Sequence, residues 1–230
     1  MAIEIELLKS IPYFLGLSAA EVEAIKQHVF EQSAERNDMI LLEEEAAHAV
    51  YFVVSGVVKV FKTSVEGKEQ ILCIVKAGES FNDIAVFDGG PNPASAIAMT
   101  PLVLYGITKT DMETILRRHP GLATNVIKIL SKKVRHFVSL VEDLSFRHVT
   151  DRLAKLLLEY GTDHGRISEG VDQRPRLTQQ EMAAMVGTAR EVVGRSLKAL
   201  EEEGAIRMDR HRIVVVNKKL LQEMSGVTGG

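Results

Sequence analysis

The sequence predicts an α+β protein made of an antiparallel barrel or roll, a long helix and a C-terminal module in which two short helices precede a hairpin. Short β-branched runs separated by glycines fill residues 39–108, which is typical of small antiparallel sheets. Residues 122–146 contain no glycine or proline and carry apolar residues in alternating steps of three and four, as a coiled-coil helix does. We therefore expect three parts, comprising residues 1–119, 120–147 and 148–230.

Composition and charge are those of an ordinary folded chain. The 230 residues are 46% hydrophobic and 26% charged, and the net charge of −3 gives no indication of a nucleic-acid partner. No apolar run is long enough to cross a membrane, and the N-terminus carries acids where a secretory signal would be basic. We expect a cytoplasmic protein without a membrane partner.

The single cysteine, Cys73, excludes several kinds of site. One cysteine cannot form an internal disulfide, a four-cysteine iron–sulfur cluster or a CxxC zinc site, and we expect no metal site. Free cysteine is among the most buried residue types, so we interpret Cys73 as a small core residue, with redox modification as the alternative. The sequence contains no catalytic constellation, and we expect that the protein is not an enzyme.

Strand patterns recur through the N-terminal half. Glycine-containing turns at Ser55–Gly56 and Glu66–Gly67 separate them, and a spacing of roughly 8–12 residues favours a small barrel or roll. Short helical patterns precede them over residues 5–30, where Ser18 is placed to cap a helix that contains Glu21. The expected strands cover residues 39–42, 50–56, 57–62, 70–75, 94–99 and 102–107.

The long helix carries a narrow apolar stripe. Its members are separated by 3, 4, 3, 4 and 3 residues, which places them at the a and d positions of three heptads. Such a stripe is narrower than the apolar face of a helix that lies on its own core. We therefore expect a parallel two-helix coil and a homodimer; a single long helix packed on the barrel is the alternative. The expected interface residues are Ile127, Leu130, Val134, Phe137, Val141 and Leu144.

Two capping patterns open consecutive short helices near the C-terminus. Thr178 and Glu181 form a T-x-x-E box at the start of QQEMAAMV, and Thr188 and Glu191 form a second box at the start of AREVVGRSLKALEEE. Gly187 lies between the two helical patterns. Two short helices joined by a glycine-containing turn are the signature of a helix-turn-helix.

The start of the second helix leaves charged side chains exposed. Arginine is suited to a bidentate bond with guanine O6 and N7, and a carboxylate can accept from cytosine N4. The segment that follows, IRMDRHRIVVVN, has a basic strand-turn-strand pattern suited to DNA phosphates. Solvated helix-terminal charges, with Glu191 serving only as a cap, are the alternative. The expected DNA-binding residues are Arg190, Glu191, Arg195, Thr178, Thr188, Arg207, Arg210 and Arg212.

These segments together resemble the CRP/FNR family of bacterial transcription regulators. TQQEMAAMVGTAREVVGRSLKALEEEGAI is similar to the family's winged helix-turn-helix, AVYFVVSGVVKVFK and FDGGPNPASA to its cyclic-nucleotide-binding-type β-roll, and residues 120–146 to its dimer helix. The resemblance implies a sequence-specific DNA-binding regulator that responds to a signal at the β-roll and has double-stranded DNA and RNA polymerase as partners. The R-E-x-x-x-R pattern at Arg190, Glu191 and Arg195 resembles that of CRP-like readers of a TGTGA half-site.

The region that would receive the signal departs from the cyclic-AMP pattern of the family. Where cyclic-AMP binders show F-G-E and then R-S or R-T, this chain has Phe81-Asn82-Asp83 and Asn92-Pro93. Residues 78–98 contain no Lys or Arg, which a cyclic phosphate would need as a partner. The candidate effector residues are Gly78, Glu79, Phe81, Asn82, Asp83, Asn92 and Ser95.

Charge makes cyclic AMP an unfavourable ligand for this segment. Glu79, Asp83 and Asp88 would set anion against anion, so we expect neither tight binding nor a requirement for cyclic AMP. Backbone amides at Gly89–Gly90, together with a lysine of the long helix such as Lys128 or Lys132, are the one route by which an anion could be held.

The identity of the signal stays open. A haem would need an axial ligand, for which the candidates are His28, His48, His148 and Cys73, so a haem-dependent gas-sensing regulator is one alternative. A ligand-binding regulatory module that acts through a protein partner is an alternative of another class. An unidentified small molecule and the absence of any effector both agree with the sequence.

Overall fold

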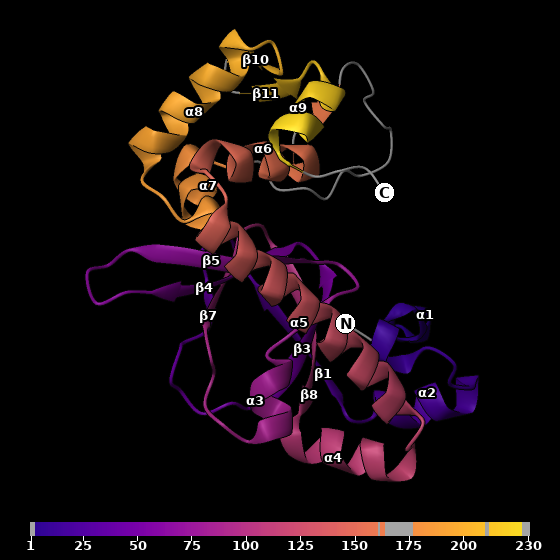
Figure 1. Ribbon diagram of the computed structural model, residues 1–230. Helices are drawn as coiled ribbons and strands as arrows, with labels where there is room; N and C mark the ends of the chain where they lie inside the picture. The colour runs from indigo at the N-terminus through magenta and orange to yellow at the C-terminus, as the bar shows by residue number, and fades with distance from the viewer. Residues whose placement is uncertain (1–2, 161, 164–176, 210–211, 227–230) are drawn as a thin grey trace. The chain divides into compact units, whose positions relative to one another are not determined.

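The structure of the protein is a computed structural model that describes residues 3–160, 162–163, 177–209 and 212–226 (Figure 1). The chain divides into two compact units. The first comprises residues 1–62 and 72–137, and the second comprises residues 63–71 and 138–230. The boundary between residues 137 and 138 lies within a long helix, which therefore contributes to both units.

Two four-stranded sheets form the β-roll. One has the order β1-β8-β3-β6 and the other the order β2-β7-β4-β5. The long central ladder is antiparallel and pairs Val50 with Ile107 and Phe52 with Tyr105. The strands of the first sheet are β1 (Val29–Ala34), β8 (Leu102–Thr108), β3 (Ala49–Ser55) and β6 (Ser80–Phe81), and those of the second are β2 (Met39–Leu41), β7 (Ser95–Ala98), β4 (Val57–Thr63) and β5 (Glu69–Lys76).

Strand β3 serves two apolar clusters because successive side chains of a strand point to opposite faces of the sheet. Tyr51 and Val53 pack into the cluster between the sheets. Val50 and Phe52 pack into a second cluster, which the N-terminal helices and the helices after β8 complete. All of these side chains are buried, so both faces of β3 lie in an apolar cluster.

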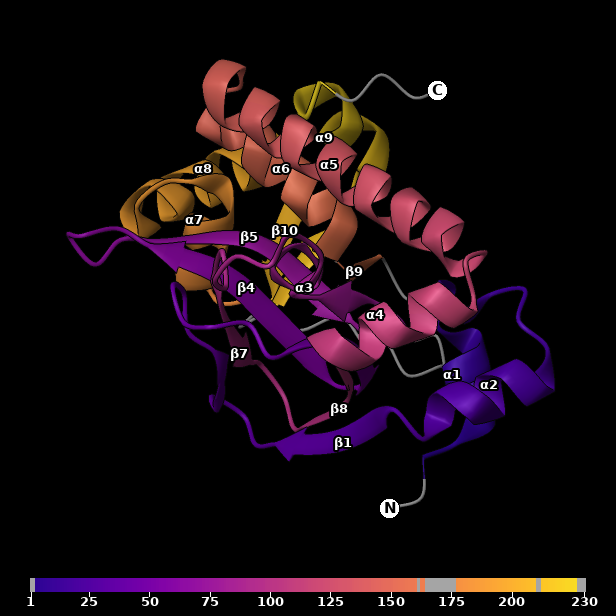
Figure 2. The ribbon, with the colours of Figure 1, turned by 90° about the horizontal axis from the view of Figure 1, so that it is seen from below.

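Helices cover the outer face of the first sheet. The predicted cap at Ser18 is confirmed, since its hydroxyl accepts from the Glu21 backbone and the Glu21 carboxylate accepts in return. Figure 2 shows α4 beside α1 and α2, which contribute to the same cluster. Within the described residues, no helix is long and apolar enough to cross a membrane. The helices of this part are α1 (Ile5–Ser10), the 3-10 turn η1 (Pro12–Phe14), α2 (Ala19–Lys26), α3 (Asp83–Asp88), α4 (Lys109–Arg118) and α5 (Leu122–Phe146).

The predicted strands and the predicted long helix are confirmed, and two strands of the roll, β1 and β6, were not predicted. Strand β1 has no strong strand pattern in VFEQSA; it forms because its backbone pairs with β8, where Val29 lies opposite Ile107. Strand β6 has two residues, too few for a pattern, and pairs with β3. Tertiary pairing therefore overrides weak local preference at both places.

The second unit is a small helical core with a hairpin. Its core contains Leu153, Met182, Val193 and Leu200, with Val215 from the hairpin. Strand β11 pairs with β10 in antiparallel fashion and with β9 in parallel. The sequence GTDHGRISEGVDQRPR at 161–176 is rich in Gly, Asp and charge, which predicts a loop or weak hairpin, and most of it lies outside the described residues. The elements are α6 (Val149–Tyr160), β9 (Thr162–Asp163), α7 (Gln179–Val186), α8 (Arg190–Glu202), β10 (Ile206–Asp209), β11 (Arg212–Val215) and α9 (Lys218–Met224).

Polar contacts bind the last turns of α5 to α6. Lys155 Nζ lies 2.5 Å from the Asp143 carboxylate and 3.0 Å from the Ser139 hydroxyl. Arg152 donates to the Arg147 carbonyl at 2.8 Å, which satisfies a backbone acceptor that the end of a helix leaves open. The end of α5 is therefore firmly attached to the helical core that carries α7 and α8.

Candidate DNA-binding and effector sites

The turn between α7 and α8 fixes the geometry of the helix-turn-helix. The Glu181 backbone donates to the Thr178 hydroxyl at 3.1 Å, and the Thr178 backbone donates to the Glu181 carboxylate at 2.6 Å, which confirms the first predicted capping box. Helix α7 ends at Gly187, whose φ of +68° is a left-handed conformation that glycine adopts without strain. Both ends of α7 are therefore held by local sequence.

The second predicted capping box is wrong. Helix α8 begins at Arg190, with Ala189 as its N-cap and no side-chain cap, and the Thr188 backbone instead donates to the Ala183 carbonyl at 3.0 Å. Glu191 then occupies the second helical position, whereas a capping box needs an acid at the third. The consequence is that the Glu191 carboxylate is not committed to the turn.

Helix α8 has a buried face and a charged face. Val193, Leu197 and Leu200 are buried. The opposite face exposes the three side chains expected to read bases, Arg190, Glu191 and Arg195. Within the described residues these three have no ion pair or side-chain hydrogen bond, and Lys198 further along the helix pairs with Glu202 at 3.6 Å. Of the two threonines expected to bind DNA, Thr178 is exposed and Thr188 is half-buried.

The hairpin after α8 presents two of its three expected arginines on one face. Arg207 lies opposite Val214, and Arg212 lies opposite Asp209, so these positions share a side of the β10–β11 ladder. Ile206 and Val215 point the other way and are buried. Arg207 and Arg212 are exposed, while Arg210 lies outside the described residues.

The expected interface residues of α5 fall into two groups. Ile127, Val134 and Val141 are exposed, and Val138, which the heptad assignment omitted, is equally exposed at 63%. Leu130, Phe137 and Leu144 are half-buried. Leu130 packs against the first-unit core, by which we mean the apolar cluster that contains Val50 and Phe52. The exposed apolar stripe of α5 is therefore formed by Ile127, Val134, Val138 and Val141.

The candidate effector residues mostly hold turns and strands of the roll. Phe81 stacks on Tyr51 with ring centroids 5.3 Å apart. Asn92 donates to the Leu42 carbonyl at 3.0 Å, and the Ser95 hydroxyl accepts from the Glu43 backbone at 3.1 Å, so both support the loop after β2. Of the others, Gly78 occupies a left-handed turn, the Glu79 carboxylate accepts from the Lys76 backbone, and Asn82 donates to the Ala49 carbonyl.

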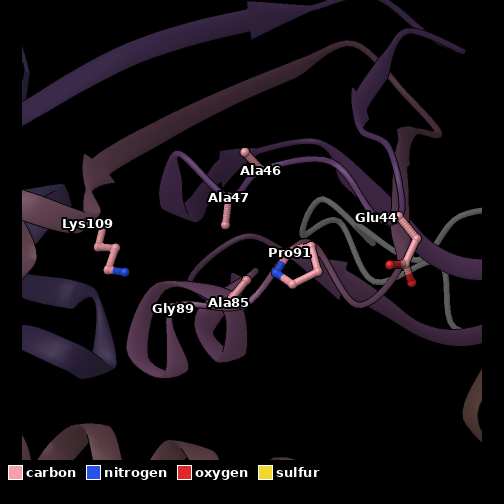
Figure 3. Close-up of a pocket in the computed structure, with 8 residues that line it drawn as sticks. Glu44, Ala46, Ala47, Ala85, Gly89, Pro91 and Lys109 are labelled. Atoms are coloured by element: carbon pink, nitrogen blue, oxygen red, sulfur yellow. The ribbon is translucent and has the colours of Figure 1, made fainter.

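A cavity of about 360 Å³ lies beside these residues but uses none of them. Figure 3 shows Lys109 and Glu44 at its two ends, with Pro91 between them. A Cβ at Gly89 would come within 2.8 Å of the Lys109 ammonium, so the absence of a side chain at Gly89 makes room for the lysine. The remaining lining residues are Ala46, Ala47, Ala85 and Gly90.

Asp83 belongs to a buried polar cluster, which we call the Asp83 cluster, formed with Tyr13, Ser80 and Lys133. Tyr13 and Ser80 donate to one carboxylate oxygen, Ser80 at 2.8 Å, and the Lys133 ammonium contacts the other oxygen. Lys133 also donates to the Ser80 carbonyl at 2.8 Å. Burial, and then the charge of Asp83, raise the pKa of Tyr13, which keeps the phenol protonated as a donor.

This cluster corrects the charge argument made from the sequence. Asp83 does not present a free anion, because Lys133 neutralises it. The lysine of α5 that reaches this segment is Lys133, whereas Lys128 and Lys132 are both exposed. Lys133 was not identified from the sequence, although its spacing along α5 could have pointed to it. Lys133 follows Leu130 by three residues and precedes Phe137 by four, so it lies on the same face of α5 as these two half-buried side chains.

Comparison with known proteins identifies the family to which the chain belongs. The Cyclic nucleotide-binding domain family matches residues 31–119, and the Crp-like helix-turn-helix domain family matches residues 151–224. The chain is 30% identical over 218 residues to the Cyclic AMP receptor protein of Thermus thermophilus, covering 95% of this chain and 98% of that protein. The chain belongs to the CRP/FNR family of bacterial transcription regulators. This CRP/FNR protein is a sequence-specific DNA-binding regulator controlled through its β-roll domain.

Two further comparisons agree with this assignment. The CRP-like cAMP-activated global transcriptional regulator of Mycobacterium tuberculosis is 25% identical over 220 residues, covering 94% of this chain and 97% of that protein. The structure of FixK2 from Bradyrhizobium japonicum shares the fold, with a TM-score of 0.73 at 21% identity, over 87% of this chain and 99% of that one.

The effector segment of this CRP/FNR protein, residues 78–95, offers a cyclic phosphate no cation of its own, because it contains no Lys or Arg. Of the lysines that reach it from other elements, Lys133 is committed to Asp83, and the Lys109 ammonium lies beside Gly89. The buried Asn82 Oδ1 has no hydrogen bond within the described residues, but a carbonyl oxygen is an acceptor and cannot hold an anion. A cyclic phosphate at this segment would therefore depend on Lys109, which lines the cavity together with Gly89 and Gly90.

The haem candidates of this CRP/FNR protein lie in different surroundings. His28 Nδ1 lies 2.7 Å from an Asp111 carboxylate oxygen, and His48 and His148 are exposed. None of the four candidates lines the cavity. Among the residues that the structure describes, no group of three or more His, Cys, Asp or Glu side chains could hold a metal ion.

Cys73 is expected to react slowly with thiol reagents in the native protein. It is half-buried on β5 against the core between the sheets, and burial raises the pKa of its thiol to about 11. Because the thiolate is the reactive form, roughly one thiol in a thousand is ionised at pH 8. We expect DTNB to label the native protein at least about a hundredfold more slowly than the denatured chain, at a rate that rises about tenfold per unit between pH 8 and 10. Rapid native labelling at pH 8 would contradict this and restore a redox role.

Proposed function

We propose that the protein acts as a homodimer that binds a two-fold symmetric DNA site through α8. Arg190 and Arg195 donate to guanines, and Glu191 accepts from a cytosine. The observation that carries this proposal is the charged face of α8, which exposes these three side chains without partners within the described residues. The ends of α7 and the buried face of α8 hold them in place.

The hairpin supports the same function. Arg207 and Arg212 lie exposed on one face of the β10–β11 ladder, where they would contact phosphates beside the recognition helix, together with Arg210. Thr178, exposed at the start of α7, would be a further phosphate contact, and Thr188 lies in the turn before α8. Such contacts position the protein on the duplex, whereas α8 supplies the sequence preference.

The exposed apolar stripe of α5 supports the dimer. Four aliphatic side chains exposed along one helix face are buried when two such helices form a parallel coil, and Leu130, Phe137 and Leu144 border that seam. The coil then sets the distance between two recognition helices, with half-sites about one helical turn apart. As a member of its family, the dimer would act on RNA polymerase in the cytoplasm.

Selection from a random double-stranded DNA library tests this function. We expect the full-length protein to recover a palindrome related to TGTGA-N6-TCACA, with one protein dimer bound to each site. The affinity should fall steeply with salt, because each neutralised phosphate contributes a slope of about −0.9 to log K against log salt. If no motif is recovered and binding does not depend on salt, the module serves a protein partner instead and the proposal is wrong.

A further inference from the structure

We propose that Lys133 takes the place of a bound ligand: it fixes the effector segment to α5, so that the DNA-binding dimer forms without a small-molecule effector. This inference rests on the proposed function and concerns its regulation. Lys133 is a positioning residue, since it acts on DNA binding through the placement of α5 and touches no DNA itself.

Both oxygens of the buried Asp83 carboxylate already have donors from this chain. One oxygen accepts from Tyr13 and from Ser80, and the other is taken by Lys133. Lys133 holds Ser80 twice, through its carbonyl at 2.8 Å and its hydroxyl at 3.2 Å. Asp83 is 3% exposed, whereas Lys133 keeps 31% of its side chain exposed, so the acid is buried and the lysine bridges it to α5.

A second contact ties the same side of α5 to the roll. His136, one turn after Lys133, lies with Nε2 3.0 Å from the Leu72 carbonyl on β5. Leu130, one turn before Lys133, packs against the first-unit core. Three successive turns of α5 are therefore attached to the roll by residues of this chain alone.

The cluster also sets the rotation of α5 about its axis. Lys133 and Val134 are neighbours in sequence and point about 100° apart on a helix of 3.6 residues per turn. With Lys133 turned inward to Asp83, Val134 and Val138 face outward, which is the orientation in which the stripe can meet a second copy. A ligand bridging the effector segment and α5 would have to produce this orientation, and Lys133 already does so.

Charge gives the cluster its strength. A carboxylate buried without a partner is strongly destabilising, so loss of the lysine removes the cation that Asp83 needs. The link between α3 and α5 is then broken while the apolar packing of α5 remains. The expected consequence is a loosened effector segment and an α5 stripe that is no longer held in one orientation.

The test uses the full-length protein and the DNA site recovered by selection, with no ligand added. Lys133→Met removes the charge and keeps much of the length of the side chain, and Lys133→Arg keeps the charge. Lys132→Met is the matched control, because Lys132 is the adjacent lysine of α5 and is exposed. DNA affinity is measured by fluorescence anisotropy, the dimer by sedimentation, and opening of residues 78–88 by hydrogen exchange.

We expect the unmodified protein to bind its site fully without ligand, with affinity changed less than twofold by 1 mM cyclic AMP or cyclic GMP. Lys133→Met should bind at least tenfold more weakly and exchange faster at residues 78–88, while Lys133→Arg and Lys132→Met stay within about threefold of the parent. The recovery with arginine is the readout that separates the ion pair from mere packing. If Lys133→Met does not fold, the pair Lys133→Met with Asp83→Asn removes both charges and should fold but bind as weakly.

Two results would overturn the proposal. One is a parent protein that binds its site only when a cyclic nucleotide is present, which leaves the DNA-binding function standing and makes the ligand the bridge. The other is a Lys133→Met variant that binds as tightly as Lys132→Met. A protein that selects no DNA sequence with or without nucleotide would instead refute the proposed function itself, and this inference with it.

Discussion

Val138→Glu is expected to convert the protein to a monomer and to lower its affinity for a palindromic site at least about a hundredfold. Val138 is 63% exposed in the protomer, so the substitution removes little packing and the fold should persist. In a two-helix coil the same position is buried next to Val134 and Val141, and each copy would bring a carboxylate into an apolar seam. Sedimentation and DNA binding measure the two effects on one sample.

The control for this substitution is Lys132→Glu, which places the same carboxylate on the same helix away from the stripe. It should remain dimeric. Phe137→Glu, the change that the heptad pattern first indicates, should also yield monomers, but Phe137 is half-buried in the protomer and its loss also affects the fold. A Val138→Glu protein that sediments as a dimer and binds its site normally would show that α5 does not form the interface.

Arg190→Ala is expected to relax sequence preference at one base pair of each half-site. A bidentate arginine–guanine pair is worth about 1–3 kcal/mol of discrimination, so the variant should lose roughly 5- to 150-fold in preference for the selected base at each half-site. The loss of affinity should be confined to sites that carry the guanine. Repeating the selection with the variant, and titrating single-base variants of the site, measures both quantities.

The comparison is with Arg212→Ala on the hairpin. Because a phosphate contact carries no sequence information, this variant should weaken binding to all sequences alike and reduce the salt slope by about 1 for each protomer of the dimer. Lys198→Ala is the matched control on α8, since Lys198 is exposed two turns further along and pairs with Glu202. Equal losses of specificity in Arg190→Ala and Arg212→Ala would remove Arg190 from base recognition.

Much of the fold and of the DNA-binding surface follows from short-range patterns. The β-branched run of β3 and the glycine turns at Gly56 and Gly67 predict strands, and the Thr178 capping box predicts the start of α7, because these signals act between residues a few positions apart. The predicted second capping box placed the N-cap of α8 one residue too early, at Thr188 instead of Ala189. In the turn after Gly187 the Thr188 backbone N–H donates to the Ala183 carbonyl, so α8 starts later than the T-x-x-E spacing suggests.

The effector region shows where such patterns stop. Counting Glu79, Asp83 and Asp88 in one segment predicts a repulsive anionic site, because the sequence does not show which of these charges meets a cation fifty residues away. Only the packed roll brings Lys133 to Asp83. The cavity is a similar case, since Glu44, Ala85 and Lys109 have no common pattern along the chain.

By itself, then, the sequence determined six strands of the roll, the long helix, the two helices of the helix-turn-helix and the exposed charges of α8, because periodicity and capping are local properties of the chain. Only the tertiary structure decided which face of α5 is turned outward, so that Val138 joins the exposed stripe while Lys133 lies inward. It also decided that Asp83 is satisfied within the protomer. The physical reason is the same in both cases: the burial and pairing of a charge depend on contacts between residues that are distant in sequence and come together only when the roll is packed.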